Sequence, residues 1–138
     1  MKNEPKISME AAVQEVLGFL QEHDIDTDTD NMMADDAKEF NEVVAAIAKP
    51  VSMGRALIDG DQYILTLKKP QGDMTTVTVS GMSAADMFAA DKAKKNNDMA
   101  KTGQIIASMI GQPFAQVSKM TSQDFMILSR LSGLFMAV

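Results

Sequence analysis

Apolar and polar residues alternate in two stretches near the middle of the chain, residues 62–70 and 74–81. The apolar residues that fall on one face of these stretches are Tyr63, Leu65, Leu67, Val77 and Val79. A period of two in valine, isoleucine, threonine and tyrosine is typical of β-strands, and the turn-forming residues at 69–73 predict a hairpin between them. Because a lone hairpin is only marginally stable in water, we expect helices to cover its apolar face.

Elsewhere the apolar residues recur every three or four positions, which predicts amphipathic helices. The expected helices are residues 8–23, a second helix ending near Lys49, and residues 83–95, 99–110, 113–120 and 121–138. The second should stop before Pro50, since proline lacks the backbone N–H that an interior helical position donates. Residues 51–60 connect that helix to the hairpin, with partial pairing to the first strand. The fold class is therefore α+β, a small antiparallel β-hairpin packed under a bundle of helices with an N-terminal helical extension.

Local signals mark several helix ends. Ser83 with Asp86, and Thr121 with Asp124, have the spacing of capping boxes, and Gly111 suits the residue just past a helix end. We predict one core under the hairpin, formed by Leu65, Leu67, Val77, Val79, Ile106, Ile110, Phe125 and Leu128.

Charge divides the chain of 138 residues into two parts. Residues 1–53 hold twelve acidic and four basic residues, a net charge of −8, whereas residues 54–138 hold seven acidic and nine basic ones. This asymmetry predicts two units, an acidic helical extension at 1–53 and a hairpin-plus-helices domain at 54–138. Neither unit is basic enough for a nucleic-acid surface, so no nucleic-acid partner is expected.

The acidic segment 24–36 has some features of a calcium-binding loop. Asp24, Asp26, Asp28, Asp30 and Asp35 occupy positions 1, 3, 5, 7 and 12 of a twelve-residue frame between two helices. An EF-hand uses oxygen ligands at this spacing, but it also needs a glycine at position 6 and a bidentate glutamate at position 12. Position 6 is a threonine here and position 12 an aspartate. A solvated acidic linker is the preferred interpretation, with a calcium-responsive module as the alternative.

Candidate catalytic groups are scarce. The chain has no cysteine, and His23 is its single histidine, which we expect at the surface near a helix end. No phosphate-binding loop, nucleophile elbow or zinc-binding motif is present in the sequence. We therefore predict no enzymatic activity, no cofactor and no metal site. No apolar run is long enough for a membrane span, and the first residues lack the apolar core of a signal peptide, so we expect no membrane partner and a cytosolic protein.

The last predicted helix ends in an apolar segment without a capping signal or a polar tail. Its tip is the predicted partner-binding site, formed by Leu131, Leu134, Phe135 and Met136, while burial of the same tip in the core is the alternative. The 13 methionines point the same way, because methionine is frequent on surfaces that adapt to partners as well as in irregular cores.

The second unit also resembles a known family. The segments YILTLKKP, TVTVSGMSAADM, IIASMIGQP and TSQDFMILSRLSGLFM, within residues 58–138, are similar in order and spacing to the Mu-like phage tail assembly chaperones. The matching positions are Asp86, Gly111, Asp124 and Phe135. Residues 1–55 have no counterpart in the family pattern.

The resemblance implies a phage or prophage chaperone, without catalysis, that binds the tape-measure protein and helps tail-tube assembly. It implies residence in the host cytoplasm and absence from the mature virion. Implied partners are the tape-measure protein, the tail-tube protein, a frameshifted longer form and further copies of the chain. A minor structural tail protein is the alternative within the same setting, and the calcium-responsive module is the alternative outside it.

Overall fold

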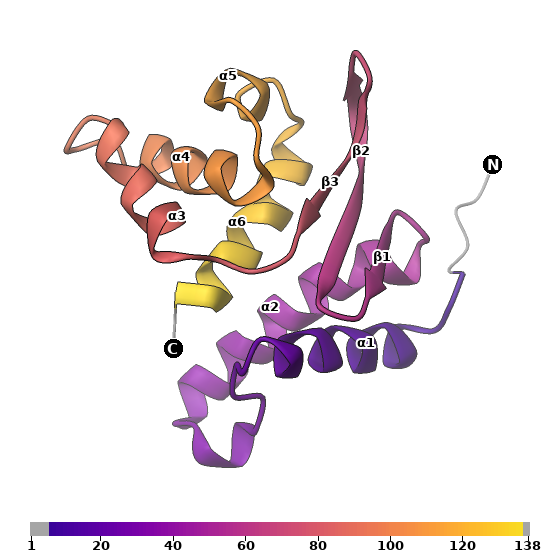
Figure 1. Cartoon of the computed structure of the whole chain (residues 1–138). Helices are drawn as coiled ribbons and strands as arrows, with labels where there is room; N and C mark the ends of the chain where they lie inside the picture. Colours follow the sequence, from indigo (N-terminus) through magenta and orange to yellow (C-terminus); the bar gives the residue numbers. More distant parts are fainter. Residues whose placement is uncertain (1–5, 137–138) are drawn as a thin grey trace.

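The computed structural model describes residues 6–136, which form an α+β fold with a three-stranded antiparallel sheet (Figure 1). The α-helices are α1 (Met9–Glu22), α2 (Ala34–Ser52), α3 (Ala84–Phe88), α4 (Asp98–Ile110), α5 (Phe114–Val117) and α6 (Ser122–Met136). The strands are β1 (Ala56–Asp59), β2 (Gln62–Gln71) and β3 (Met74–Val79), and two short 3-10 helices are η1 (Thr29–Asn31) and η2 (Ala89–Lys92). The predicted fold class is confirmed.

The predicted hairpin corresponds to β2 and β3, and β1 adds a third strand. In the register, Leu65 of β2 pairs with Ala56 of β1 and with Val77 of β3, so these three side chains share one face of the sheet. The strand β2 continues through Pro70 to Gln71, into the turn predicted at 69–73. Proline cannot donate a ladder hydrogen bond, and the pairing of β2 with β3 is irregular over this segment.

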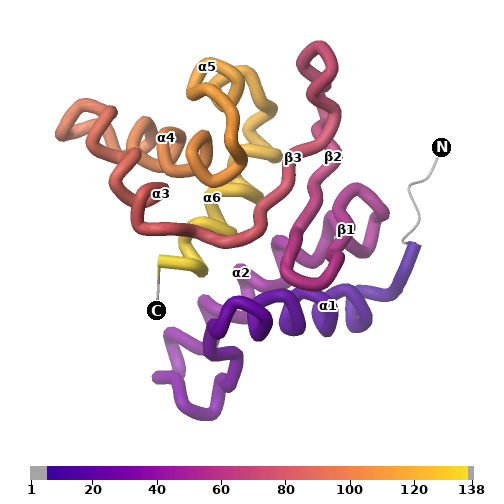
Figure 2. The backbone as a smooth tube through the Cα atoms, viewed as in Figure 1, coloured from indigo at the N-terminus to yellow at the C-terminus, as the bar shows by residue number. Residues whose placement is uncertain are grey.

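The helices form two groups, as Figures 1 and 2 show. The first group, α1 and α2, contacts β1. In the second group, α3 to α5, it is α4 that contacts the sheet, at β3. The helix α6 contacts both α2 and α4 and so joins the two groups. Figure 2 shows the acidic connection between α1 and α2 as a wide loop at the bottom of the view.

One hydrophobic cluster runs through the described residues and includes side chains from both predicted units. Phe19 of α1 and Ile47 of α2 belong to it together with Tyr63 and Leu65 of the sheet. Of the eight predicted core residues, six are buried, while Ile110 and Phe125 are partly buried against the same cluster. The predicted boundary between 1–53 and 54–138 therefore crosses a shared core, and the division into two units stays a prediction from charge alone.

Three helix ends differ from the prediction. The helix α2 continues through Pro50 to Ser52 instead of ending at Lys49. Pro50 lies in the last turn, where only one intrahelical hydrogen bond depends on its missing N–H, and the turn is kept because Pro50, Val51 and Ser52 are buried. The segment predicted as a helix to residue 95 is shorter, since α3 ends at Phe88 and is followed by η2, which ends at Lys92. The helix predicted at 113–120 is also shorter, since α5 ends at Val117.

Candidate functional site

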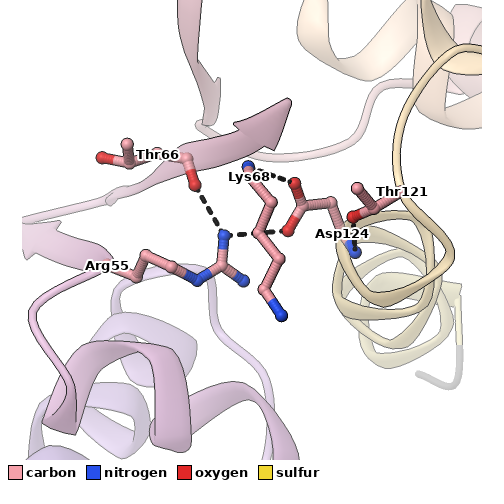
Figure 3. Close-up of polar contacts among 5 residues, drawn as sticks. All are labelled: Arg55, Thr66, Lys68, Thr121 and Asp124. Atoms are coloured by element: carbon pink, nitrogen blue, oxygen red, sulfur yellow. Dashed lines mark hydrogen bonds and ion pairs between the residues drawn. The ribbon is translucent and has the colours of Figure 1, made fainter. Parts of the chain in front are cut away.

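Asp124 is fully buried at the start of α6 and holds that helix to the sheet (Figure 3). Its backbone N–H donates to the hydroxyl of Thr121, which is one half of the predicted capping box. The carboxylate points elsewhere: Oδ2 accepts a 2.8 Å hydrogen bond from the backbone N–H of Lys68. Oδ1 lies 2.9 Å from Nη1 of Arg55, which also donates to the carbonyl of Thr66. The interpretation of Asp124 as only a capping residue was therefore incomplete.

Asp86 forms the other predicted capping box, and here the prediction is confirmed. Ser83 accepts from the Asp86 N–H, and Asp86 Oδ2 accepts from the Ser83 N–H. The second oxygen, Oδ1, accepts a 2.6 Å hydrogen bond from the hydroxyl of Ser108 on α4. Desolvation alone would raise the pKa of Asp86, but the hydrogen bonds from Ser108 and Ser83 together outweigh it and lower that pKa. The residue fixes α3 against α4.

His23 is half-buried, where the sequence indicated a surface position. Its Nε2 lies 2.7 Å from the carbonyl oxygen of Asp61, in the β1–β2 turn. Its ring makes edge contacts with Phe19 of α1 and Phe135 of α6, at centroid distances of 4.9 and 5.0 Å. Because its ring joins α1, the sheet and α6, His23 has a packing role.

The four predicted partner-binding residues are split between core and surface. Leu131 and Leu134 are buried, and Phe135 is half-buried against His23 and Phe19. Met136 is the most open of the four, at 41% exposed. Ala137 and Val138, at the end of the predicted tip, lie outside the described residues. Contact of this tip with another chain stays a prediction, with Met136 and the exposed part of Phe135 as its accessible surface.

The carboxylates of the acidic loop act on their own backbone. Asp26 accepts from the N–H of Asp28, and Asp28 accepts from the N–H of Asp30 and caps η1. Such turns orient the side chains towards nearby amides instead of a common centre. Within residues 6–136 no group of three His, Asp or Glu side chains is arranged to hold a metal ion. The linker interpretation fits this geometry better than the calcium loop.

A groove of about 690 Å³ lies between α2, α6 and the acidic loop. Its apolar lining comes from Ile25, Met32, Phe40, Val43 and Leu134. Among the described residues, its charged lining is Asp26, Asp36 and Glu39 with one base, Arg130. Gly133 also lines the α6 side. The α2 members are spaced three and four residues apart, so they share one helix face. We call this the α2–α6 groove.

A second depression, of about 420 Å³, lies between α4, α5 and α6. Phe114 of α5 covers Gly103 of α4 so closely that an added Cβ would lie 2.8 Å from its ring. Among the described residues, the other lining of this depression includes Met99 and Phe125 and no charged side chain. This depression offers apolar contact without a means of selecting a partner by charge.

The sequence reasoning missed the α2–α6 groove. Phe40 and Val43 lie on the apolar stripe of the second predicted helix, and in the structure both are only half-buried. The signal that was available is the pair Asp36 and Glu39, which continue the same helix face with acids. What the sequence lacked was the position of α6, which forms the opposite wall.

No helix among the described residues combines the length and apolarity that a membrane crossing requires. The family resemblance rests on four positions, and each has a structural role. Asp86 forms a helix cap, and Gly111 ends α4 in the left-handed backbone conformation. Asp124 forms a buried ion pair, and Phe135 belongs to an aromatic cluster. Comparison with known proteins finds no matching family model, curated protein or solved structure.

Proposed function

We propose that this chain is a tail assembly chaperone of a phage or prophage. In this role it binds the tape-measure protein in the host cytoplasm, keeps it soluble and helps the tail tube assemble around it. The order of the four segments in residues 58–138 supports the proposal. The positions that resemble the family have structural roles, so we assign partner binding to the surface between these positions.

The observation that carries the proposal is the unusual surface of the molecule. Nine large hydrophobic side chains are exposed among the described residues, and six of them are methionine: Met9, Met33, Met87, Met99, Met126 and Met136. Scattered exposed apolar residues are ordinary, but methionine in this proportion provides a flexible and polarisable contact surface. A chaperone for a long helical client needs such a surface, because it must accept several sequences in turn.

The acidic charge of residues 1–53 is consistent with the same role. A net charge far from zero keeps a protein with exposed apolar side chains soluble through mutual repulsion. Within this proposal the tail-tube protein, a frameshifted longer form and further copies of the chain are additional partners. The chaperone leaves before the tail is finished, whereas a minor tail protein would remain in it.

The experiment is co-expression of this chain with the product of the neighbouring tape-measure gene, scored by the soluble fraction of that product. Solubility should rise with this chain and should not rise with an unrelated acidic protein of similar size. A tape-measure protein that stays insoluble, or is equally soluble without the chain, contradicts the proposal. Mass spectrometry of purified particles then separates the two tail roles, since the chaperone should be absent from them.

A further inference from the structure

We infer that the α2–α6 groove is a docking site for a basic amphipathic helix of a partner protein. The inference relies on the proposed function for the partner's identity, but the chemistry of the partner follows from the groove itself. Its walls are the faces of two helices, Asp36 to Val43 on α2 and Arg130 to Leu134 on α6. A third helix laid against two others is a common mode of peptide recognition, with apolar anchors spaced three and four residues apart.

The size and lining of the groove set what enters it. A volume of about 690 Å³ accommodates a few apolar side chains, not a whole helix. The partner therefore inserts its anchors between Phe40 and Val43 on one side and Leu134 on the other. Because Phe40 and Val43 are only half-buried in the free protein, covering them removes apolar surface from water and stabilises the complex.

Charge decides which helix fits. Three acids line the groove and one base faces them, and the next residues of the loop and of α2 add further exposed acids. Within residues 6–136 the ion pairs are Arg55–Asp124 and Lys101–Asp98, so neither Asp36 nor Glu39 forms an ion pair. A helix with lysines or arginines beside its apolar stripe pairs with these carboxylates, while an acidic helix is repelled.

Gly133 allows a steric test. A Cβ added at this exposed α6 position meets no atom within 4 Å, so a large side chain there occupies the groove without disturbing the fold. Gly18, exposed on α1 and outside the groove, has the same open surroundings. Tryptophan has a higher helix propensity than glycine, so both tryptophan variants should remain folded.

The probe is a fluorescein-labelled amphipathic peptide of about 20 residues, long enough to form a helix, with leucines on one face and lysines beside them. Fluorescence anisotropy should show binding that weakens as salt is raised, because salt screens the charges. Gly133→Trp should weaken binding at least about tenfold, whereas Gly133→Ala and Gly18→Trp should leave it within about twofold. If Gly133→Trp and Gly18→Trp bind the peptide equally, and circular dichroism shows that both variants are folded, the proposed docking site is wrong.

A charge test uses matched double variants of α2. The first variant, Asp36→Lys with Glu39→Lys, should abolish binding of the basic peptide. The control variant, Asp35→Lys with Glu42→Lys, changes the net charge by the same amount at positions outside the groove lining. It should reduce binding much less. A peptide with glutamates in place of lysines should not bind, and if it binds as well as the basic one the charge argument is wrong.

The failures of the two proposals are distinguishable in the co-expression experiment. If wild type and Gly133→Trp both keep the tape-measure protein soluble, the groove inference fails and the chaperone function stands. If the basic peptide binds and Gly133→Trp blocks it, but wild type does not solubilise the tape-measure protein, the groove stands and the proposed function fails.

Discussion

The hydroxyl of Tyr63 donates a 2.7 Å hydrogen bond to the backbone carbonyl of Ile47. Tyr63 lies in β2 and Ile47 in α2, and both side chains are fully buried. Ile47 lies three residues before Pro50, near the end of α2, where the missing N–H of the proline removes one helical hydrogen bond. The hydrogen bond from Tyr63 therefore connects the acidic helical part to the sheet across the boundary that the charge distribution suggested.

Replacing Tyr63 by phenylalanine should lower the free energy of unfolding by about 1–2 kcal/mol, because the ring is kept but a buried hydrogen bond is lost. Urea unfolding followed by circular dichroism measures the change. A loss below about 0.5 kcal/mol, as for an ordinary surface substitution, would show that this bond contributes little.

Tyr63 should also make the protein sensitive to alkali. Desolvation by burial raises its pKa above the ordinary value of 10.0, and the nearby positive charge of Arg55 only partly opposes this. The neutral tyrosine side chain is thus favoured in the folded state. The stability that this preference gives the folded protein is fully present below pH 10 and is lost as the pH rises above that value. Each further pH unit costs about 1.4 kcal/mol until the folded pKa is reached.

This alkaline effect has a clean readout, since Tyr63 is the single tyrosine and the chain has no tryptophan. Tyrosinate absorbance should appear together with the loss of helical circular dichroism, and in urea-unfolded protein it should appear near pH 10. Tyr63→Phe should lose less stability between neutral and alkaline pH than wild type does. Ionisation near pH 10 in protein that is still folded would contradict the burial argument.

Phe19 tests whether the first 53 residues fold as a separate unit. It is 1% exposed and contacts Tyr63 at a centroid distance of 6.0 Å. Phe19→Ala should cost about 3–5 kcal/mol, as for other buried aromatic residues, and should lower the stability of the whole molecule in one transition. Denaturant unfolding of the full chain measures this.

Deletion of residues 1–53 is the stronger form of the same test. The remainder should lose cooperative unfolding, because Tyr63 and Leu65 would lose the α1 and α2 side chains of their shared cluster. If residues 54–138 instead unfold cooperatively, and Phe19→Ala produces a separate early transition, the two-unit prediction from charge is right.

Asp124→Ala should destabilise the protein by about 2–3 kcal/mol. Breaking a buried ion pair costs about 3–5 kcal/mol, but the Arg55 side chain is 26% exposed and water can partly replace its lost partner. The Lys68 N–H also loses its acceptor. Urea unfolding gives the value, and Asp124→Asn should recover part of it by keeping an acceptor oxygen for that N–H.

The exposed pair Asp98–Lys101 is the control, with 3.8 Å between its charged atoms. Lys101→Ala should cost no more than about 0.5 kcal/mol, because exposed ion pairs contribute little. If Asp124→Ala and Lys101→Ala have equal effects, the buried position of Asp124 has no special importance.

Local pattern was enough to predict much of the fold. The period of two placed Leu65 and Val77 on the same face, Ser83 and Asp86 formed the expected capping box, and Gly111 adopts a φ of 70° at the end of α4. These features depend on residues a few positions apart in the sequence, so their physical causes can be found in a short window.

Tertiary structure decided the features that depend on distant segments. The carboxylate of Asp124 bonds to an N–H 56 residues earlier in the chain, and Leu131 and Leu134 are buried because α6 passes between α2 and α4. The same path of α6 turns the half-buried stripe of Phe40 and Val43 into one wall of a groove. A helical period shows which face is apolar, but burial depends on what is packed against that face, and the chain's three-dimensional path determines that.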